Sequence, residues 1–275
     1  MALSSAAALR AELAERNRRY AAKRGCLACE SRGGVTLYEP VASATTHGNF
    51  LSASYQAIVR DPEWRVRLNK EHSHSKQLPP ANHGGRWREL DSCMSSDALL
   101  MNVFCYPRVF ADGRLARLLG VDEAARPRFG FPARVPLANG NADRTEVDMR
   151  LGDLLLESKL TEGDFQQKTK NIVARYRDFA EVFDHRLLPQ THDRYLSYQL
   201  IRNVLAAHAL GISFCVLLDA RRNDLREDWH AVMRAVRTAD LRIRSKTLTW
   251  QELAPVLPHP LQRFLAEKYG IQSAD

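Results

Sequence analysis

Residues 146–159, EVDMRLGDLLLESK, place charged side chains among residues that are typical of buried strands. A Gly-Asp pair lies between two strand-like runs, and a Gly-X pair is typical of a two-residue type II′ hairpin turn. Residues that pair directly across a hairpin point to the same face. Counting outward from the turn therefore predicts one face with two opposed pairs of charged residues: Asp148 with Glu157, and Glu146 with Lys159.

The charges on this face predict a metal site. Two carboxylates directly opposed across strands repel each other, and a divalent cation offsets that repulsion. Mg²⁺ binds one or two carboxylates and takes further oxygens from water and substrate phosphate. We expect Mg²⁺ or Mn²⁺ at Asp148 and Glu157, with Glu146 either as a third ligand or as the partner of Lys159. A lysine beside such a metal can orient an attacking water or help to deprotonate it.

A purely structural interpretation competes with this one. Glu146 and Lys159 also match an ordinary cross-strand ion pair, and Asp148 and Glu157 could face water at the edge of a sheet. The leucines at 154–156 form a strand segment that is apolar on both faces, which is unusual for a solvated edge. This segment favours the metal site.

The surrounding sequence predicts the elements that position the hairpin. Ser95 is a typical N-cap before an apolar run, and the glycines at 25 and 211 are typical helix ends. Residues 212–219 form a continuous apolar run that predicts a buried strand. The order strand, strand, helix, strand predicts an α/β fold with a mixed sheet flanked by helices. Helices are expected at residues 5–24, 95–106, 112–119, 164–184, 195–210, 224–238 and 249–268.

Asp148, Glu157 and Lys159 together resemble the motif of the PD-(D/E)xK nuclease superfamily, an acid on one strand and acid-x-Lys on the next. Val147 stands where the name of the motif has proline. The stretches SSDALLMNVF, ESKLTEGDF and YQLIRN are similar to bacterial proteins labelled restriction endonucleases, and the resemblance covers residues 95–220. It implies a restriction-endonuclease-like α-β-β-β-α-β core, with its first strand in RFGFPARVPL.

The resemblance also implies a polar residue on the helix after the motif that supports the site. Gln199 is the residue we expect there, and Tyr198 and Asn203 are alternatives for the same task. Asp97 could supply an extra acid, although its place in the first turn of a helix favours an interaction with the helix dipole. By analogy, cleavage of both DNA strands would need two sites and hence a homodimer. The arginines expected to bind the phosphate backbone are Arg150, Arg175 and Arg202.

The cysteines do not predict a disulfide framework, because their number, five, is odd. Cys26 and Cys29 form a CxxC that could be half of a zinc site, with His72 and His74 as the nearest candidates for the other half. A structural zinc site normally shows all four ligands at tight spacing. We therefore favour reduced, packed cysteines over zinc at Cys26 and Cys29.

Net charge and hydropathy limit the classes of partner and the cellular locations that are expected. The net charge of +8, in which arginine dominates the basic residues, favours a polyanion such as nucleic acid. The sequence contains no apolar run that could cross a membrane and no signal-peptide pattern near its start. We expect a cytoplasmic protein that does not bind a membrane. We also expect an N-terminal helix with an irregular extension at 1–92 and a nuclease-like domain with C-terminal helices at 93–275.

These observations predict a metal-dependent nuclease that hydrolyses phosphodiester bonds in DNA, of a restriction, defence or repair type. The first alternative is a non-catalytic protein that binds nucleic acid on the same fold. The second is a metal-free interaction module in which Glu146 and Lys159 form a structural ion pair. Because a degenerate site would be expected to lose at least one of its residues, the presence of both acids and the lysine favours the enzyme.

Overall fold

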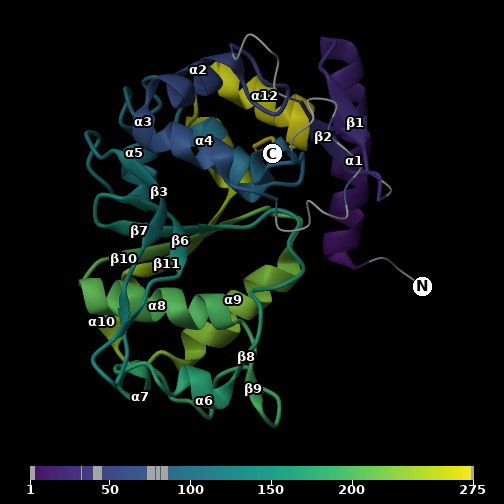
Figure 1. Cartoon of the computed structure of the whole chain (residues 1–275). Coiled ribbons are helices and arrows are strands. Elements are labelled where there is room, and N and C mark those ends of the chain that lie inside the picture. Colours follow the sequence, from purple (N-terminus) through teal and green to yellow (C-terminus); the bar gives the residue numbers. More distant parts are fainter. Residues whose placement is uncertain are drawn as a thin grey trace. The chain divides into compact units, whose positions relative to one another are not determined.

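The computed structural model describes residues 4–31, 33–39, 45–72, 78, 81 and 86–273 (Figure 1). The chain divides into two compact units. The first unit consists of Met1–Pro127 and Trp250–Asp275, and the second unit is Arg128–Thr249. Compactness thus divides the chain after residue 127 and again after residue 249. The expected division at residue 92 concerns where the nuclease-like domain begins, and it stays a prediction.

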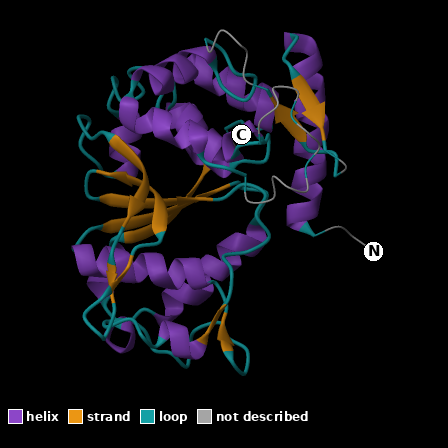
Figure 2. Cartoon of the chain, viewed as in Figure 1, coloured by secondary structure: helices purple, strands orange, loops and turns teal. Residues whose placement is uncertain are grey.

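The second unit is built around the five-stranded mixed sheet that Figure 2 shows in orange. Strand β10 is parallel to both β7 and β11, whereas β6 is antiparallel to β7. This confirms the expected α/β fold with a mixed sheet. In spatial order the strands are β11 (Ser245–Thr249), β10 (Ser213–Leu218), β7 (Leu154–Ser158), β6 (Glu146–Leu151) and β3 (Pro127–Pro132).

The central strands form because their side chains are buried on both faces. Every residue of β7 is buried, and all but the first residue of β10 are buried. Such strands read as continuous apolar runs, which is why residues 212–219 could be recognised in the sequence. Strand β11 was not expected, because its sequence SKTLT is largely polar and it lies at the sheet edge, only partly buried.

Helices pack against this sheet within the second unit. Helix α8 (Tyr198–Leu210) ends at Gly211, whose φ of +67° suits a glycine, and it contributes Ile201, Val204 and Leu205 to the core. Helix α9 (Asn223–Ala235) places Trp229 against Phe214 of β10, with ring centroids 5.8 Å apart. The short helix α10 (Ala239–Ile243) leads into β11.

The prediction of a single helix at 164–184 is wrong. This segment contains β8 (Lys168–Thr169) and two single-turn helices, α6 (Lys170–Val173) and α7 (Phe179–Val182). Its backbone groups bond elsewhere instead of continuing a helix: β8 pairs with β9 (Arg194–Tyr195), and the segment 174–178 bonds to the loop that carries β4 (Val135–Pro136) and β5 (Ala142–Asp143). Tertiary pairing has overridden a helical pattern.

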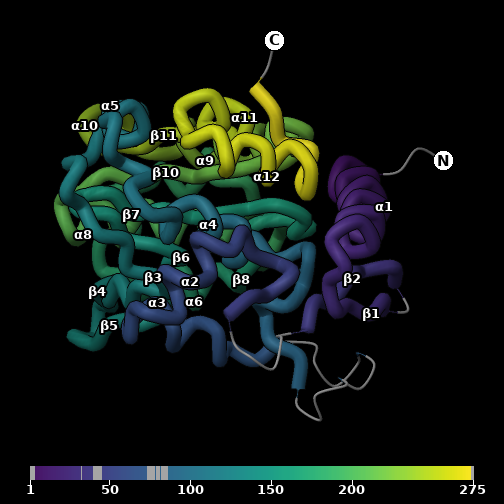
Figure 3. The backbone as a smooth tube through the Cα atoms, turned by 90° about the horizontal axis from the view of Figure 1, so that it is seen from above, coloured from purple at the N-terminus to yellow at the C-terminus, as the bar shows by residue number. Residues whose placement is uncertain are grey.

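The first unit is mainly helical. Helix α1 (Ser5–Arg24) and helix α12 (His259–Tyr269) lie side by side although they are far apart in the chain (Figure 3). Lys23 and Arg24 form ion pairs of 2.6 and 2.7 Å with Glu267 across this contact. The remaining elements of this unit are β1 (Ala28–Glu30), β2 (Thr36–Tyr38), α2 (Ser52–Arg60), α3 (Pro62–Arg65), η1 (Val66–Asn69), η3 (Glu89–Asp91), α4 (Ser96–Phe104), α5 (Arg114–Leu119), α11 (Trp250–Leu253) and η4 (Ala254–Val256).

Several expected helix boundaries are confirmed in this unit. Ser95 caps α4, since its Oγ accepts a hydrogen bond of 3.1 Å from the amide of Ala98. Gly25 ends α1 with a φ of +60°. Among the described residues, the helices include none that is both long and apolar enough to span a membrane.

Candidate active site

The hairpin of β6 and β7 has the register that the turn predicted. Leu151 pairs with Leu154, Arg150 with Leu155 and Met149 with Leu156. Gly152 in the turn has a φ of +56°, a conformation that favours glycine. One step beyond this ladder, Asp148 Oδ2 accepts a hydrogen bond of 2.7 Å from the amide of Ser158. The carboxylate of Asp148 is therefore bound to the backbone directly beside Glu157.

Glu157 and Lys159 form a buried ion pair at the end of β7. Lys159 Nζ lies 2.9 Å from Glu157 Oε1, and the two residues are only 5% and 1% exposed. The amide of Lys159 donates to the carbonyl of Leu217 in β10 at 2.8 Å, which fixes the backbone after β7. The ammonium also lies 5.6 Å from the centre of the Phe165 ring. Both charged groups are thus held in place by a rigid sheet.

Helix α8 supports the second oxygen of Glu157 through Asn203. The amide Nδ2 of Asn203 donates to Glu157 Oε2 at 2.8 Å, and both residues are buried. Arg202 in turn donates to Asn203 Oδ1 at 3.0 Å and to the backbone carbonyl of Glu146 at 3.0 Å. Asn203 was an alternative to Gln199 for the supporting role, and it is the residue that contacts the acid.

Gln199 lies one turn before Asn203 on the same face of α8, because residues four apart share a helix face. Its backbone amide donates to the carbonyl of Phe165, whose ring contacts Lys159. Its Oε1 is buried, and no hydrogen-bond donor reaches it among the residues that the structure describes. The expected role of Gln199 in the site stays a prediction.

The electrostatics of the site are dominated by acids. Burial alone would lower the pKa of Lys159, but the carboxylates of Glu157, Glu162 and Asp148 outweigh it and raise that pKa above its ordinary value. Glu162 belongs to the loop after β7, where its Oε2 accepts from the amide of Leu160 at 2.6 Å. Three acids thus surround one ammonium, and the local charge is negative.

The donor set fits a divalent cation in its chemistry. Asp148 and Glu157 supply the one or two carboxylates that Mg²⁺ normally takes from a protein, and the excess negative charge favours a cation. Both oxygens of Glu157 already have partners in Lys159 and Asn203, so a cation would share Oε1 with the lysine. Glu146 is exposed, and its place as a third ligand stays a prediction.

The structure contains no group of three or more His, Cys, Asp or Glu side chains that could hold a metal ion, as far as its described residues extend. Cys26 and Cys29 therefore belong to no such group among the described residues. They are half-buried free thiols, and burial raises their pKa values. His72 is described, whereas His74, the other histidine considered for a zinc site, lies outside the described residues.

Other candidate residues have partners away from Glu157. The hydroxyl of Tyr198 bonds to that of Tyr176 at 2.7 Å. Asp97, in the first unit, accepts from Arg67 at 2.9 Å and from Lys70 at 3.3 Å.

The three arginines expected to bind phosphate differ in exposure. Arg202 is only 4% exposed and is committed to Asn203 and the carbonyl of Glu146, so the expectation that it binds the phosphate backbone is wrong. Arg150 is half-buried beside the Phe131 ring, and Arg175 is exposed. The burial of Arg202 could not be foreseen, because its partners come from two other segments of the chain.

Comparison with known proteins gives one match. The model of the family described as Restriction Endonuclease associating with ARP matches residues 8–270. Neither the curated proteins nor the solved structures contain a match to the chain. Because the family match covers nearly the whole sequence, including both units and the hairpin, the chain belongs to the family of restriction endonucleases associating with ARP.

Proposed function

We propose that this protein is a PD-(D/E)xK-type nuclease that hydrolyses phosphodiester bonds in DNA with Mg²⁺ or Mn²⁺ at Asp148 and Glu157. One observation carries the proposal: Asp148, Glu157 and Lys159 come together at the end of a rigid hairpin, with acids in excess. Membership of a restriction-endonuclease family supports a nuclease and DNA as its substrate.

The metal would supply charge neutralisation at the phosphate and a lower pKa for the attacking water. The protein's own residues supply position and charge. Asn203 holds Glu157 Oε2 and so orients Oε1 toward Lys159. Because the acids raise the pKa of Lys159, this side chain is an ammonium in the absence of substrate. As an ammonium it would donate hydrogen bonds to the attacking oxygen or to the phosphate.

Gln199 would complete the site as an acceptor. Its buried Oε1 can accept a hydrogen bond from a water, which would orient that water for attack. Glu146, exposed at the start of β6, would supply a third carboxylate. Two copies of the chain would cut the two strands of a duplex.

A non-catalytic DNA-binding protein is the second candidate, and the burial of the ion pair favours it. Glu157 is 1% exposed and each of its oxygens has a protein partner, as in a purely structural ion pair. Such a protein would bind DNA without cleaving it.

Cleavage of a supercoiled plasmid with Mg²⁺, scored for nicked, linear and degraded products, decides between these candidates. Asp148→Asn should reduce the rate by at least about 100-fold, since removal of one group that stabilises charge in a transition state has effects of this size. Asp153→Asn is the matched control, because Asp153 lies in the turn of the same hairpin with its side chain 90% exposed. Its rate should equal that of the wild type.

Two results would contradict the nuclease proposal. The first is no cleavage of any DNA by the wild-type protein with either metal, together with no heat of Mg²⁺ binding. The second is full activity of both Asp148→Asn and Lys159→Ala, which would move the active site elsewhere.

A further inference from the structure

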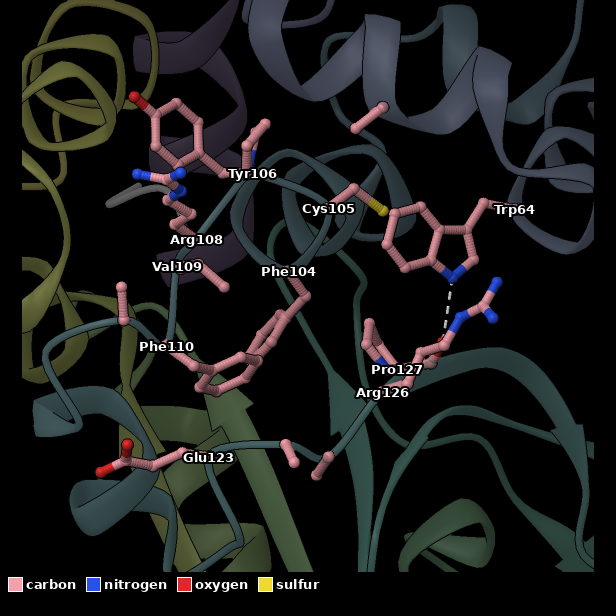
Figure 4. Close-up of a pocket in the computed structure, with 15 residues that line it drawn as sticks. Trp64, Phe104, Cys105, Tyr106, Arg108, Val109, Phe110, Glu123, Arg126 and Pro127 are labelled. Carbon is pink, nitrogen blue, oxygen red and sulfur yellow. Dashed lines mark hydrogen bonds between the residues drawn. The ribbon is translucent and has the colours of Figure 1, made fainter.

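A pocket of about 690 Å³ lies within the first unit, where α2, α3, α4 and the loops around Pro107 and Pro127 carry its walls (Figure 4). This volume is within the range of roughly 300–1,000 Å³ that is typical of small-molecule sites. Its lining combines aromatic rings with arginines at its rim: Trp64, Phe104, Tyr106, Phe110, Arg108 and Arg126. The candidate active site contains none of these residues.

The aromatic wall is held rigidly. Phe104 is 2% exposed and its ring centroid lies 6.2 Å from that of Phe110; the two rings are adjacent in Figure 4. Trp64 is only half-buried, but its Nε1 donates to the carbonyl of Pro127 at 3.0 Å and Arg126 lies over its ring at 5.6 Å. An indole fixed in this way presents a flat apolar face to the pocket at little entropic cost.

The charged residues that line the pocket are Arg108, Arg126 and Glu123, and the two arginines differ in their pairing. Arg126 shares its charge with Asp61 through a direct ion pair. No ion pair or hydrogen bond of the Arg108 guanidinium is found among the described residues, and Arg108 is exposed at the pocket beside Tyr106. Arg108 also has a φ of +59°, a strained conformation for a residue with a side chain. Such strain persists only where the surroundings hold it, and it clusters at functional sites.

We propose that this pocket binds one unstacked nucleobase of the DNA substrate, with Trp64 stacking on the base and Arg108 beside its phosphate. This rests on the proposed function, because it names how the substrate of that nuclease is held. A flat ring with an attached anion matches a flat aromatic wall with an unpaired guanidinium at its rim. A base within a duplex is already stacked on both faces, so the pocket accepts a base that is single-stranded or has been turned out of the helix.

The protein carries its own probe for this binding. Its four tryptophans are Trp64, Trp87, Trp229 and Trp250, and the last three are 1%, 4% and 0% exposed. Only the half-buried Trp64 is placed to touch a ligand in the pocket. Stacking of a base on Trp64 should therefore quench the most accessible part of the tryptophan fluorescence.

The experiment titrates the full-length protein, with EDTA present to prevent cleavage, with a single-stranded oligonucleotide of about ten adenines, which is within the usual site size. An abasic oligonucleotide with the same number of phosphates is the matched ligand control. We expect quenching and binding by the adenine strand, and binding by the abasic strand that is weaker by about 5- to 100-fold, the usual effect of removing one base–aromatic stack.

The variants separate stacking, charge and folding. Trp64→Leu should remove the quenching and weaken binding of the adenine strand to the level of the abasic strand, whereas Trp64→Phe keeps an aromatic face and most of the affinity. Arg108→Asn should weaken both ligands, and asparagine tolerates the left-handed backbone of this position. Arg19→Gln, an exposed arginine on α1 outside the pocket, is the control for loss of one charge and should change binding little.

Equal affinity for the adenine and abasic strands would overturn the proposal. Wild-type quenching in Trp64→Leu would overturn it too. If Trp64→Leu does not fold, wild-type quenching by free dAMP that is kept in Trp64→Phe, which lacks the reporting indole, counts against it. No quenching of the wild type by dAMP at saturation counts against it too. The two proposals can fail separately. If quenching depends on the base and is kept in Lys159→Ala, but neither the wild type nor any variant cleaves DNA, the base-binding pocket is supported and the nuclease proposal is contradicted.

Discussion

Lys159 in the second unit and Lys268 in the first are both buried, yet their environments shift their pKa values in opposite directions. Lys268 is fully buried on α12, where its Nζ donates to Asn17 Oδ1 at 2.5 Å and lies 3.8 Å from the centre of the Tyr38 ring. Burial lowers the pKa of Lys268 to about 7. The pKa of Lys159 is raised instead, although burial opposes this.

The neighbours explain the difference. Desolvation disfavours the ammonium in both places. Around Lys159 the attraction of the carboxylates of Glu157, Glu162 and Asp148 stabilises the ammonium by more than desolvation destabilises it. Around Lys268 the partners are an amide oxygen and the faces of tyrosine rings, which attract a cation without carrying a full negative charge. A buried lysine among acids fits an electrostatic role in chemistry, and a buried lysine among rings fits a role in packing.

The largest effect is expected from removing the ammonium of Lys159. Lys159→Met leaves Glu157 buried without its cation, and breaking a buried ion pair in this way costs about 3–5 kcal/mol of unfolding free energy. Urea unfolding at neutral pH measures it. Mg²⁺ should restore more stability to this variant than to the wild type, because a cation bound at the acids replaces the lost charge. Unchanged stability of the variant would show that the ion pair is not what holds Glu157 in place.

Because burial lowers the pKa of Lys268, this residue should make the free energy of unfolding increase with pH. Its pKa in the folded state, about 7, lies below the unfolded value of 10.5, so the unfolded chain binds more protons between these values. Stability from this group therefore increases as pH rises from about 7 to 10.5, by at most roughly 1.4 kcal/mol per pH unit, and is constant below and above this window.

Comparison of the wild type with Lys268→Met isolates this contribution. The difference in unfolding free energy between the two proteins, measured by urea unfolding at a series of pH values, should be largest in favour of the variant near pH 7 and should shrink as the pH rises. In the wild type Tyr38 also donates to Asn17 Oδ1 at 2.9 Å, so that oxygen should keep a partner in the variant. A difference that does not change with pH would mean that the rings keep Lys268 charged.

The smallest of these effects is expected at Asn203. Asn203→Leu removes the donor to Glu157 Oε2 and the acceptor of Arg202, which leaves buried polar groups unsatisfied at a cost of about 1–3 kcal/mol. DNA cleavage should fall as well, because Glu157 loses its orientation. Asn203→Asp sharpens the test, since a further acid beside Glu157 should destabilise the protein more at pH 8 than at pH 5. Because Arg202 also donates to this side chain, equal stability at both pH values would mean that its guanidinium offsets the repulsion. Unchanged stability of Asn203→Leu would argue that Asn203 does not support Glu157.

Much of the hairpin could be predicted from the sequence because its information is local. The Gly-Asp turn set the register, and the register predicted which charged residues share a face. The partner of Lys159 was harder to predict from the sequence. Pairing by register suggested Glu146, whereas the ammonium lies 2.9 Å from Glu157, two residues before it. A long side chain at a strand end can turn back along its own strand, and register alone does not exclude this.

The residues that support the site depended on contacts between distant segments. Asn203 and Gln199 lie on one face of the same helix, and only the packing of α8 against β7 decides that Asn203 reaches Glu157. Arg202 was expected at the surface because arginine usually is. It is buried because Asn203 and the carbonyl of Glu146 together satisfy its guanidinium.

The sequence by itself determined the mixed α/β class, the register of the hairpin, several helix ends and the set of acids and lysine, because each follows from local pattern and backbone geometry. Only the tertiary structure decided that residues 164–184 do not form one helix, that SKTLT forms an edge strand, and that Lys159 and Lys268 have opposite pKa shifts. These features depend on which groups from distant segments meet in a medium of low polarity, where the partner of each charge determines its free energy.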